Sequence, residues 1–202
     1  MPAEEKFNIV LKNGFAELLM PRGFENKGNN FYLKLNGLGH LINVQKSAWG
    51  TREHSKFTIN IGIFVPKVWL EFFNFPHKEV PNIPRDVDCL IRKRIGTLKN
   101  KSDNWYRLSK ETPESDLLNQ VHFDIQNYIF PYLSNFDTME KLLTNLEQED
   151  LPLFPMGKMV AYSNFNMLEN AKREYQQLLK EYPDEGFQNK VKDFGKKYKL
   201  DR

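Results

Sequence analysis

The sequence has few of the features that mark secreted or membrane-bound proteins. Its only cysteine is Cys89, so no disulfide can form within the chain, and this usage fits a reducing compartment. No run of about 18 apolar residues occurs, which excludes a membrane-spanning helix. Residues 1–20 mix charged side chains with apolar ones and do not resemble a secretion signal. We therefore expect a cytoplasmic protein that does not engage a membrane.

The side chains that usually build catalytic and metal sites are also scarce. The four histidines, His40, His54, His77 and His122, form neither a His-x-His nor an HExxH pattern, and there is no cysteine pair. Cys89 alternates with isoleucine, which is typical of a core strand; a nucleophile beside a histidine is the alternative. The sequence therefore predicts no catalytic residue, no metal site and no cofactor.

What the chain does have is enough apolar surface for one core. Of its 202 residues, 40% are hydrophobic and 13% are aromatic, and a chain of this length buries roughly 70% of the surface that its unfolded form exposes. We find no internal repeat and no linker, so residues 1–202 are expected to form a single domain. The patterns predict an α+β fold, with a helix and a sheet in residues 1–110 and a helical half over 111–202.

Alternation of apolar and polar residues predicts a small antiparallel sheet of about five strands. Five segments bounded by turn residues have this pattern: 31–36, 41–47, 56–65, 89–95 and 104–108. The third has the clearest period of two, since Phe57, Ile59, Ile61 and Ile63 share one face. We expect the strands to follow one another as a meander.

Helical periodicity predicts the remaining elements. Residues 1–20 form an amphipathic opening helix that ends before Pro21. Apolar stripes predict further helices at about 117–129, 139–146, 165–179 and 187–198. Between the third and fourth strands, residues 66–88 combine four prolines with the aromatic residues Trp69, Phe72, Phe73 and Phe75. We expect this segment to be an ordered excursion packed on the core, without long regular structure.

Charge is unevenly distributed although the formal net charge is only +3. Residues 85–110 carry a net charge of +5, and residues 111–150 carry −8. The two blocks either attract each other within the fold or present faces of opposite sign to partners.

Two arginines give the candidate site its charge. Arg92 and Arg94 share one face of the predicted strand over 89–95, together with Leu90, whereas Cys89 takes the opposite face. Their guanidinium groups would hold a carboxylate or phosphate through paired hydrogen bonds. The structural alternative is that both arginines pair with the acidic helix at 114–124.

Polar side chains on the neighbouring strands complete the candidate site. Asn60 lies on the polar face of the third strand, and the amides of Asn43 and Gln45 lie on the second. Trp105 adds an aromatic surface beside the basic stretch. The candidate ligand-binding residues are Gln45, Asn60, Arg92, Arg94 and Trp105.

Three functional readings follow, and we favour the first. It is a non-enzymatic binding module that presents this polar sheet face to a protein or a small anionic ligand. The second is an enzyme of unrecognised type, with Arg92, Arg94 or Gln45 holding an anion near His54 or Cys89. The third is nucleic-acid binding through residues 85–110, against which stand the modest net charge and the lack of any known nucleic-acid motif.

Several blocks of the sequence occur in the order seen in a known family. They read RGFENKGNNFY, LINVQKS, KFTINIGIF, DCLIRKRIG, NWYRL and IFPYLSNFDTMEKLL. Across residues 5–147 the chain thus resembles the bacterial domain of unknown function 4304 family. The resemblance implies an α+β bacterial protein with no established activity, so no catalytic residue is carried over. The helices beyond about residue 160 fall outside it and are expected to be an extension.

Overall fold

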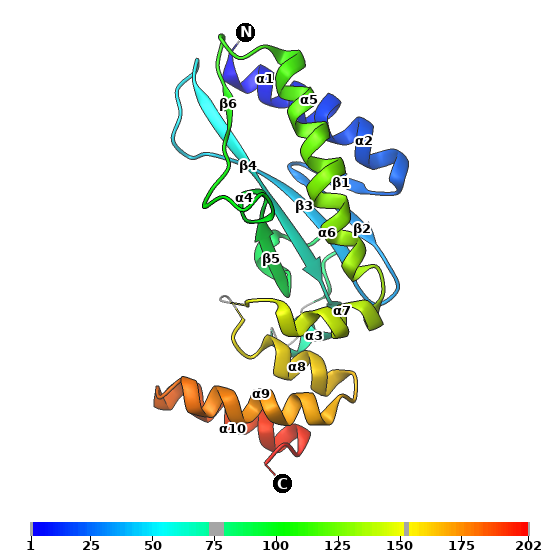
Figure 1. The fold of residues 1–202 in the computed structure, drawn as a ribbon, viewed down its shortest axis with the longest axis vertical. Helices are drawn as coiled ribbons and strands as arrows, with labels where there is room; N and C mark the ends of the chain where they lie inside the picture. Colours follow the sequence, from blue (N-terminus) through cyan, green and yellow to red (C-terminus); the bar gives the residue numbers. More distant parts are fainter. Residues whose placement is uncertain (1, 73–78, 152–153, 202) are drawn as a thin grey trace.

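The computed structural model describes residues 2–72, 79–151 and 154–201. His77, together with Phe73 and Phe75 of the predicted excursion, lies outside the described residues. The molecule is elongated, with the N-terminal helix and sheet at one end and the last helices at the other (Figure 1).

The opening helix forms as predicted and ends at a glycine. It comprises α1 (Ala3–Ile9), a π-helical stretch (Val10–Ala16) and α2 (Glu17–Leu19), followed by a 3₁₀ turn (Met20–Arg22). Gly23 then adopts a φ of +87°, a left-handed conformation that stops a helix at little cost for glycine.

The sheet is antiparallel and has six strands rather than five. They are β1 (Glu25–Lys27), β2 (Asn30–Lys34), β3 (Gly39–Lys46), β4 (Ser55–Phe64), β5 (Ile91–Arg94) and β6 (Tyr106–Leu108). The prediction missed β1 because its three residues are polar and exposed and show no alternation.

The predicted meander is wrong at its last step, because β6 pairs with β4 and not with β5. With ten residues, β4 is long enough to have two partners along one edge. β5 pairs with its C-terminal part, from Asn60 to Ile63, and β6 pairs with its N-terminal part, from Ser55 to Phe57. The short helix α4 (Ile95–Leu98) and a loop connect these two strands, which lie end to end beside β4 (Figure 1).

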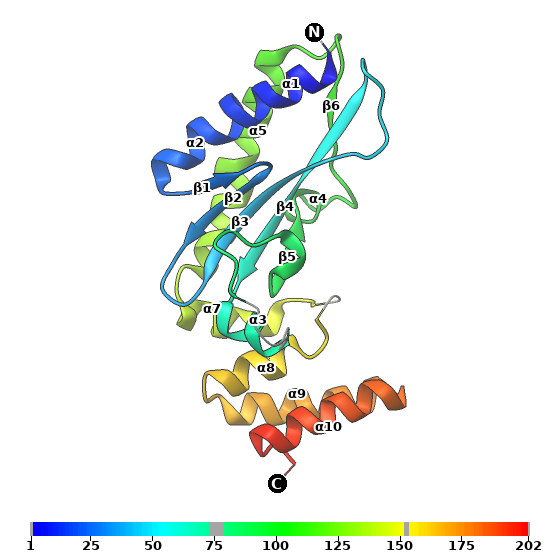
Figure 2. The ribbon, with the colours of Figure 1, turned by 180° about the vertical axis from the view of Figure 1, so that it is seen from behind.

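The alternation along β4 separates an apolar face from a mixed one. Phe57, Ile59, Ile61 and Ile63 belong to the main hydrophobic core together with residues of the opening helix and of α5 (Glu114–Asp124). The face turned toward the viewer in Figure 2 lies on the side of the sheet opposite α5. This second face therefore holds the polar residues of β3 and β4.

The second face is apolar at one end only. There, Tyr32, Leu41, Phe64 and Cys89 form a small separate cluster with Trp69 of α3 (Pro66–Phe72). A 3₁₀ turn (Asp86–Asp88) ends the excursion before β5. The described part of residues 66–88 thus packs on the sheet with only short helical turns, as its prolines predict.

The helical half begins on the sheet and continues beyond it. Its elements are α5, a π-helical stretch (Ile125–Ile129), α6 (Phe130–Leu133), a 3₁₀ turn (Ser134–Phe136), α7 (Met139–Asn145), a 3₁₀ turn (Leu146–Gln148), α8 (Gly157–Asn164), α9 (Leu168–Glu181) and α10 (Glu185–Tyr198). Phe72 of α3 contacts the rings of Phe154 and Phe194, which joins the last helices to the end of the sheet. Among the described helices, we find none that has both the length and the apolar character of a bilayer span.

A buried histidine makes the stability of this fold depend on pH. His40 of β3 is buried and its Nε2 lies 3.0 Å from the carbonyl oxygen of Phe136. Burial lowers the pKa of His40 below its ordinary value of 6.5, although the Phe136 carbonyl and Asp137 oppose the shift. The unfolded chain therefore binds more protons below pH 6.5, and the free energy of unfolding falls as the pH drops from there toward the lowered pKa.

The substitution His40→Gln removes this titration and can keep a donor toward Phe136. We expect the melting temperature of the wild type to fall more steeply than that of the variant between about pH 7.5 and about pH 5.5, because only the wild type has a buried imidazole to protonate there. Thermal denaturation followed by circular dichroism measures both curves. Parallel curves would show that His40 is not the titrating group.

Candidate functional site

Hydrogen-bonded amides cross the polar face of the sheet. Asn43 donates from Nδ2 to Oδ1 of Asn30 at 2.7 Å. Asn60 donates from Nδ2 to Oδ1 of Asn43 and to Oε1 of Gln45, both at 2.9 Å. These contacts follow from the register, in which Asn43 lies opposite both Asn30 and Asn60. We call Asn30, Asn43, Asn60 and Gln45 the amide row.

Arg94 and Trp105 stand at one end of the amide row. A guanidinium nitrogen of Arg94 donates to Oε1 of Gln45 at 3.4 Å, and another lies 3.3 Å from the carboxylate of Asp103. The guanidinium carbon is 5.8 Å from the centre of the Trp105 ring. Trp105 in turn donates its indole N–H to Asp103 at 2.6 Å. Four of the five predicted site residues, namely Gln45, Asn60, Arg94 and Trp105, therefore lie in one connected cluster.

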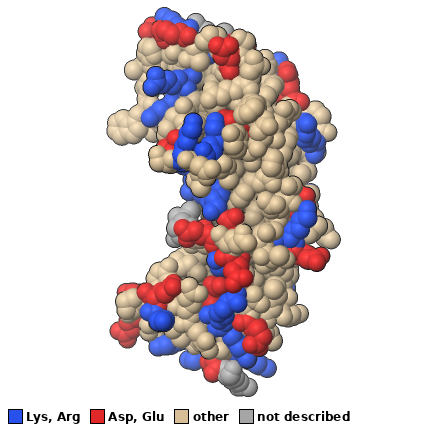
Figure 3. All heavy atoms as spheres, in the orientation of Figure 1, with Lys and Arg blue, Asp and Glu red and all other residues tan. Residues whose placement is uncertain are grey.

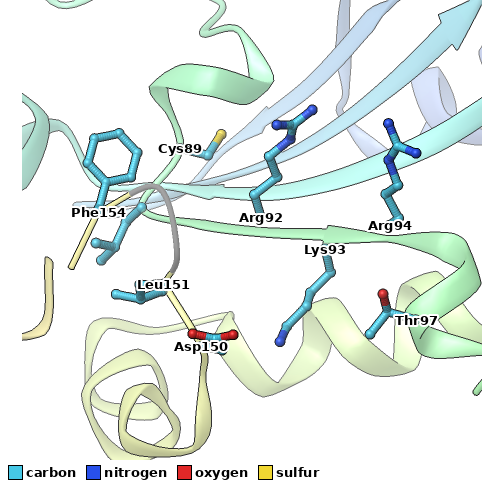
Figure 4. Close-up of a pocket in the computed structure, with 9 residues that line it drawn as sticks. Cys89, Arg92, Lys93, Arg94, Thr97, Asp150, Leu151 and Phe154 are labelled. Carbon is cyan, nitrogen blue, oxygen red and sulfur yellow. The ribbon is translucent and has the colours of Figure 1, made fainter. Parts of the chain in front are cut away.

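The fifth predicted residue, Arg92, projects from β5 on the same side as Arg94, as Figure 4 shows. Its guanidinium group pairs with Asp86 at 2.5 Å, whereas Arg94 pairs with Asp103. The expectation that both arginines pair with the helix at 114–124 is therefore wrong. Each arginine pairs with a carboxylate in a turn close to β5. Within the basic block, the side chain that pairs with the helix at 114–124 is Lys99, which contacts Asp124.

The predicted face of Cys89 is also wrong, because the strand contains an irregularity before Arg92. Ile63 of β4 lies opposite Ile91, yet its carbonyl also accepts a hydrogen bond from the amide of Leu90 at 2.9 Å. Two residues opposing one is the pattern of a β-bulge, which shifts the alternation by one residue. Leu90 thus joins the main core, and Cys89 lies on the side of Arg92.

A cavity of about 400 Å³ lies along the outer side of β5. Three consecutive basic residues, Arg92, Lys93 and Arg94, form one wall, and Asp150 and Leu151 belong to the opposite wall. Cys89, Leu90 and Phe154 line its apolar end. The space-filling view shows a hollow at the waist of the molecule, with basic side chains above it and acidic ones below (Figure 3). We call this cavity the β5 groove.

The basic block around the groove is largely neutralised by neighbouring acids. Six of its eight side chains form ion pairs: Arg85 with Asp88, Arg92 with Asp86, Lys93 with Glu149, Arg94 with Asp103, Lys99 with Asp124 and Lys110 with Glu53. Two of them, those of Lys93 and Lys99, join the basic block to the acidic one, which agrees with attraction between the blocks within the fold.

Two polar atoms near the amide row are buried without a hydrogen-bond partner among the described residues. They are Oδ1 of Asn60 and Oγ1 of Thr58, both on β4. Because buried polar atoms are nearly always paired, each such atom calls for an explanation.

The enzyme reading gains no support from the surroundings of Cys89. Burial raises the pKa of its thiol well above the usual value, and the nearby Asp86 and Asp88 raise it further. The thiol therefore stays protonated and unreactive. His54 precedes β4 and is exposed, whereas Cys89 contacts Gly62 near the other end of that strand. At 3.3 Å per residue along β4, His54 and Cys89 are roughly 25 Å apart.

Among the described residues, no group of acids, histidines and cysteine is arranged to hold a metal ion.

The fold and this cluster define an α+β protein with a polar sheet face and a groove beside an edge strand. The model of the family described as Domain of unknown function (DUF4304) matches residues 15–135. Since this is more than half of the chain, the protein belongs to the DUF4304 family, as the sequence blocks indicated. Helices α8, α9 and α10 lie outside the matched range. Searches of the curated proteins and of the solved structures found no match.

Sequence reasoning missed the residues that complete the site. Asp103, which joins Arg94 to Trp105, gives no signal beyond being one acid within a basic stretch. Asp150 and Leu151 reach the groove only because the chain between α7 and α8 passes beside β5 (Figure 1). No periodicity or spacing in the sequence encodes that contact.

Proposed function

We propose that this protein is a non-catalytic binding module that takes up an acidic segment of another protein in the β5 groove. The observation that carries the proposal is that three consecutive basic residues line a cavity of about 400 Å³, with Arg92 and Arg94 on one side of β5 and Lys93 on the other. The volume is within the range of about 300–1,000 Å³ that sites for drug-sized ligands have. As part of the same proposal, the module acts in the bacterial cytoplasm, where its single cysteine would stay reduced.

The paired arginines remain able to bind a further carboxylate. A guanidinium group has five N–H donors in a planar fork, and the contacts of Arg92 and Arg94 with Asp86, Asp103 and Gln45 use only some of them. The pairs also hold both side chains in fixed orientations, with about a third of each still exposed at 28% and 37%. An incoming carboxylate would therefore meet donors that are already oriented, which lowers the entropy lost on binding.

A peptide titration tests this function. The probe is a short acetylated and amidated peptide that alternates glutamate with threonine, and its binding is followed by fluorescence anisotropy. We expect the double variant Arg92→Gln, Arg94→Gln to bind at least about tenfold more weakly, because it loses two charge-assisted contacts of the strong kind. Its melting temperature should fall by only a few degrees, since partly exposed ion pairs contribute about 1 kcal/mol each.

The matched control is Arg173→Gln. Arg173 on α9 also pairs with one carboxylate, that of Glu147, but it is more exposed than Arg92 and Arg94 and does not line the groove. It should leave binding unchanged. Equal binding by the wild type and the double variant, or no binding by either, would refute the function. Equally strong binding of free succinate would instead make the groove a site for small anions.

A further inference from the structure

The backbone of β5 faces the groove on the side away from β4. β5 pairs with β4 alone among the described strands, so its other edge has no strand partner there. Which backbone groups point outward follows from the register. The amide of Ser47 donates to the carbonyl of Lys56, so the even-numbered residues of β4 bond to β3 and the odd-numbered ones bond to the strands on the other side.

Because the odd-numbered residues of β4 bond to β5, the backbone groups of Arg92 and Arg94 point away from β4. Ile61 and Ile63 of β4 are odd-numbered, and their partners in β5 are Lys93 and Ile91. Those two residues use their amides and carbonyls on β4, whereas the N–H and C=O of Arg92 and the N–H of Arg94 point toward the groove. Arg94 also caps the start of α4, so its carbonyl lies at the first turn of that helix.

The side chains of Arg92, Lys93 and Arg94 determine which kind of peptide segment fits beside this edge of β5. A strand added beside β5 would lie about 4.8 Å away. Its residues opposite Arg92 and Arg94 would have their side chains next to the two guanidinium groups, on the same face. Carboxylates at alternate positions match that spacing. Residues of the other parity would face Lys93, whose charge is already paired with Glu149 at 2.9 Å.

We infer that the acidic segment binds as an extended strand added antiparallel to β5, with carboxylates at alternate positions opposite Arg92 and Arg94. This inference rests on the proposed function and specifies its mode. Backbone hydrogen bonds to Arg92 and Arg94 hold the segment, and the guanidinium groups select its acidic residues. The apolar end of the groove, at Cys89, Leu90 and Phe154, takes an apolar residue at one end of the segment.

Methylation of the peptide backbone tests the mode without altering the protein. Two versions of the alternating glutamate and threonine peptide are compared, one with N-methyl groups on its glutamate amides and one with them on its threonine amides. In a strand added antiparallel to β5, as every other pair of strands in this sheet is arranged, the residues opposite Arg92 and Arg94 direct their amides toward β5. We therefore expect methylation at glutamate to weaken binding by roughly tenfold or more, and methylation at threonine to change it much less.

A pair of protein variants gives a second readout. Arg92→Gln removes the guanidinium group, and Arg92→Pro removes both that group and the outward amide. Because this amide does not bond to β4, proline is compatible with the edge position. We expect Arg92→Pro to bind about tenfold more weakly than Arg92→Gln.

The outcomes separate the two proposals. If the unmethylated peptide binds with the expected dependence on the arginines but both methylated peptides bind equally well, side chains alone hold it and strand addition is refuted. If the peptide does not bind, or binds without regard to Arg92 and Arg94, the proposed function fails first. If only threonine methylation abolishes binding, the glutamate amides do not face β5. The segment then either runs parallel to β5 or has its threonines opposite the two arginines, and both results overturn the inference.

Discussion

Replacing Asp124 by alanine is expected to lower the free energy of unfolding by about 3–5 kcal/mol, because it leaves the largely buried ammonium group of Lys99 without its partner. Asp124 is fully buried on α5, and both of its oxygens lie 2.8 Å from Nζ of Lys99. The hydroxyl of Tyr106 also donates to it, at 2.5 Å. One carboxylate thus joins α5 to β6 and to the end of α4.

A matched variant separates this effect from that of an exposed ion pair. Glu53 pairs with Lys110 at 3.1 Å, and both side chains are more than half exposed. Glu53→Ala should cost about 1 kcal/mol or less. In thermal denaturation, Asp124→Ala should melt roughly 10 °C below the wild type, whereas Glu53→Ala should melt close to it. Similar melting temperatures for the two variants would show that Asp124 has no structural role.

The substitution Phe57→Ala is expected to cost about 3–5 kcal/mol, because it empties a ring-sized volume at the centre of the core. Phe57 of β4 is fully buried and stacks on Tyr106, with ring centres 4.7 Å apart. Its ring also contacts Phe7 and Phe15 of the opening helix, at 5.9 and 6.4 Å. A single side chain therefore holds the sheet, β6 and the N-terminal helix together.

Phe123→Ala is the control for Phe57→Ala. Phe123 belongs to α5 and is 55% exposed, so its removal should change stability by about 0.5 kcal/mol or less. Chemical denaturation in urea measures both variants against the wild type. A cost at Phe57 no larger than that at Phe123 would contradict the packing described for the core.

The parts of the fold that could be predicted from the sequence are those with a strong local period. β4 illustrates this, since its alternating isoleucines fixed the strand and its buried face at once. β1 has no such period and was missed. The pairing of β6 with β4 could not be derived from the sequence either. It depends on how much of the β4 edge stays free once β5 has paired with it, and this length is known only from the folded sheet.

The candidate site was predictable to the extent that it follows from alternation. Asn60 and Gln45 lie together because period two places both on the polar face of adjacent strands. Cys89 was assigned to the wrong face because the bulge at Leu90 leaves no signal in the residue types. The partners of the arginines were also unpredictable, because Asp86 and Asp103 reach them through turns whose shape the sequence does not specify.

The central claim is that an acidic segment pairs with the outward backbone of β5. Amide NMR spectra of the isotope-labelled protein, recorded during titration with the glutamate and threonine peptide, test it most directly. We expect the amides of Arg92 and Arg94 to shift and to exchange more slowly with solvent once the peptide is bound. Shifts confined to other surfaces, with unchanged exchange at Arg92 and Arg94, would contradict it.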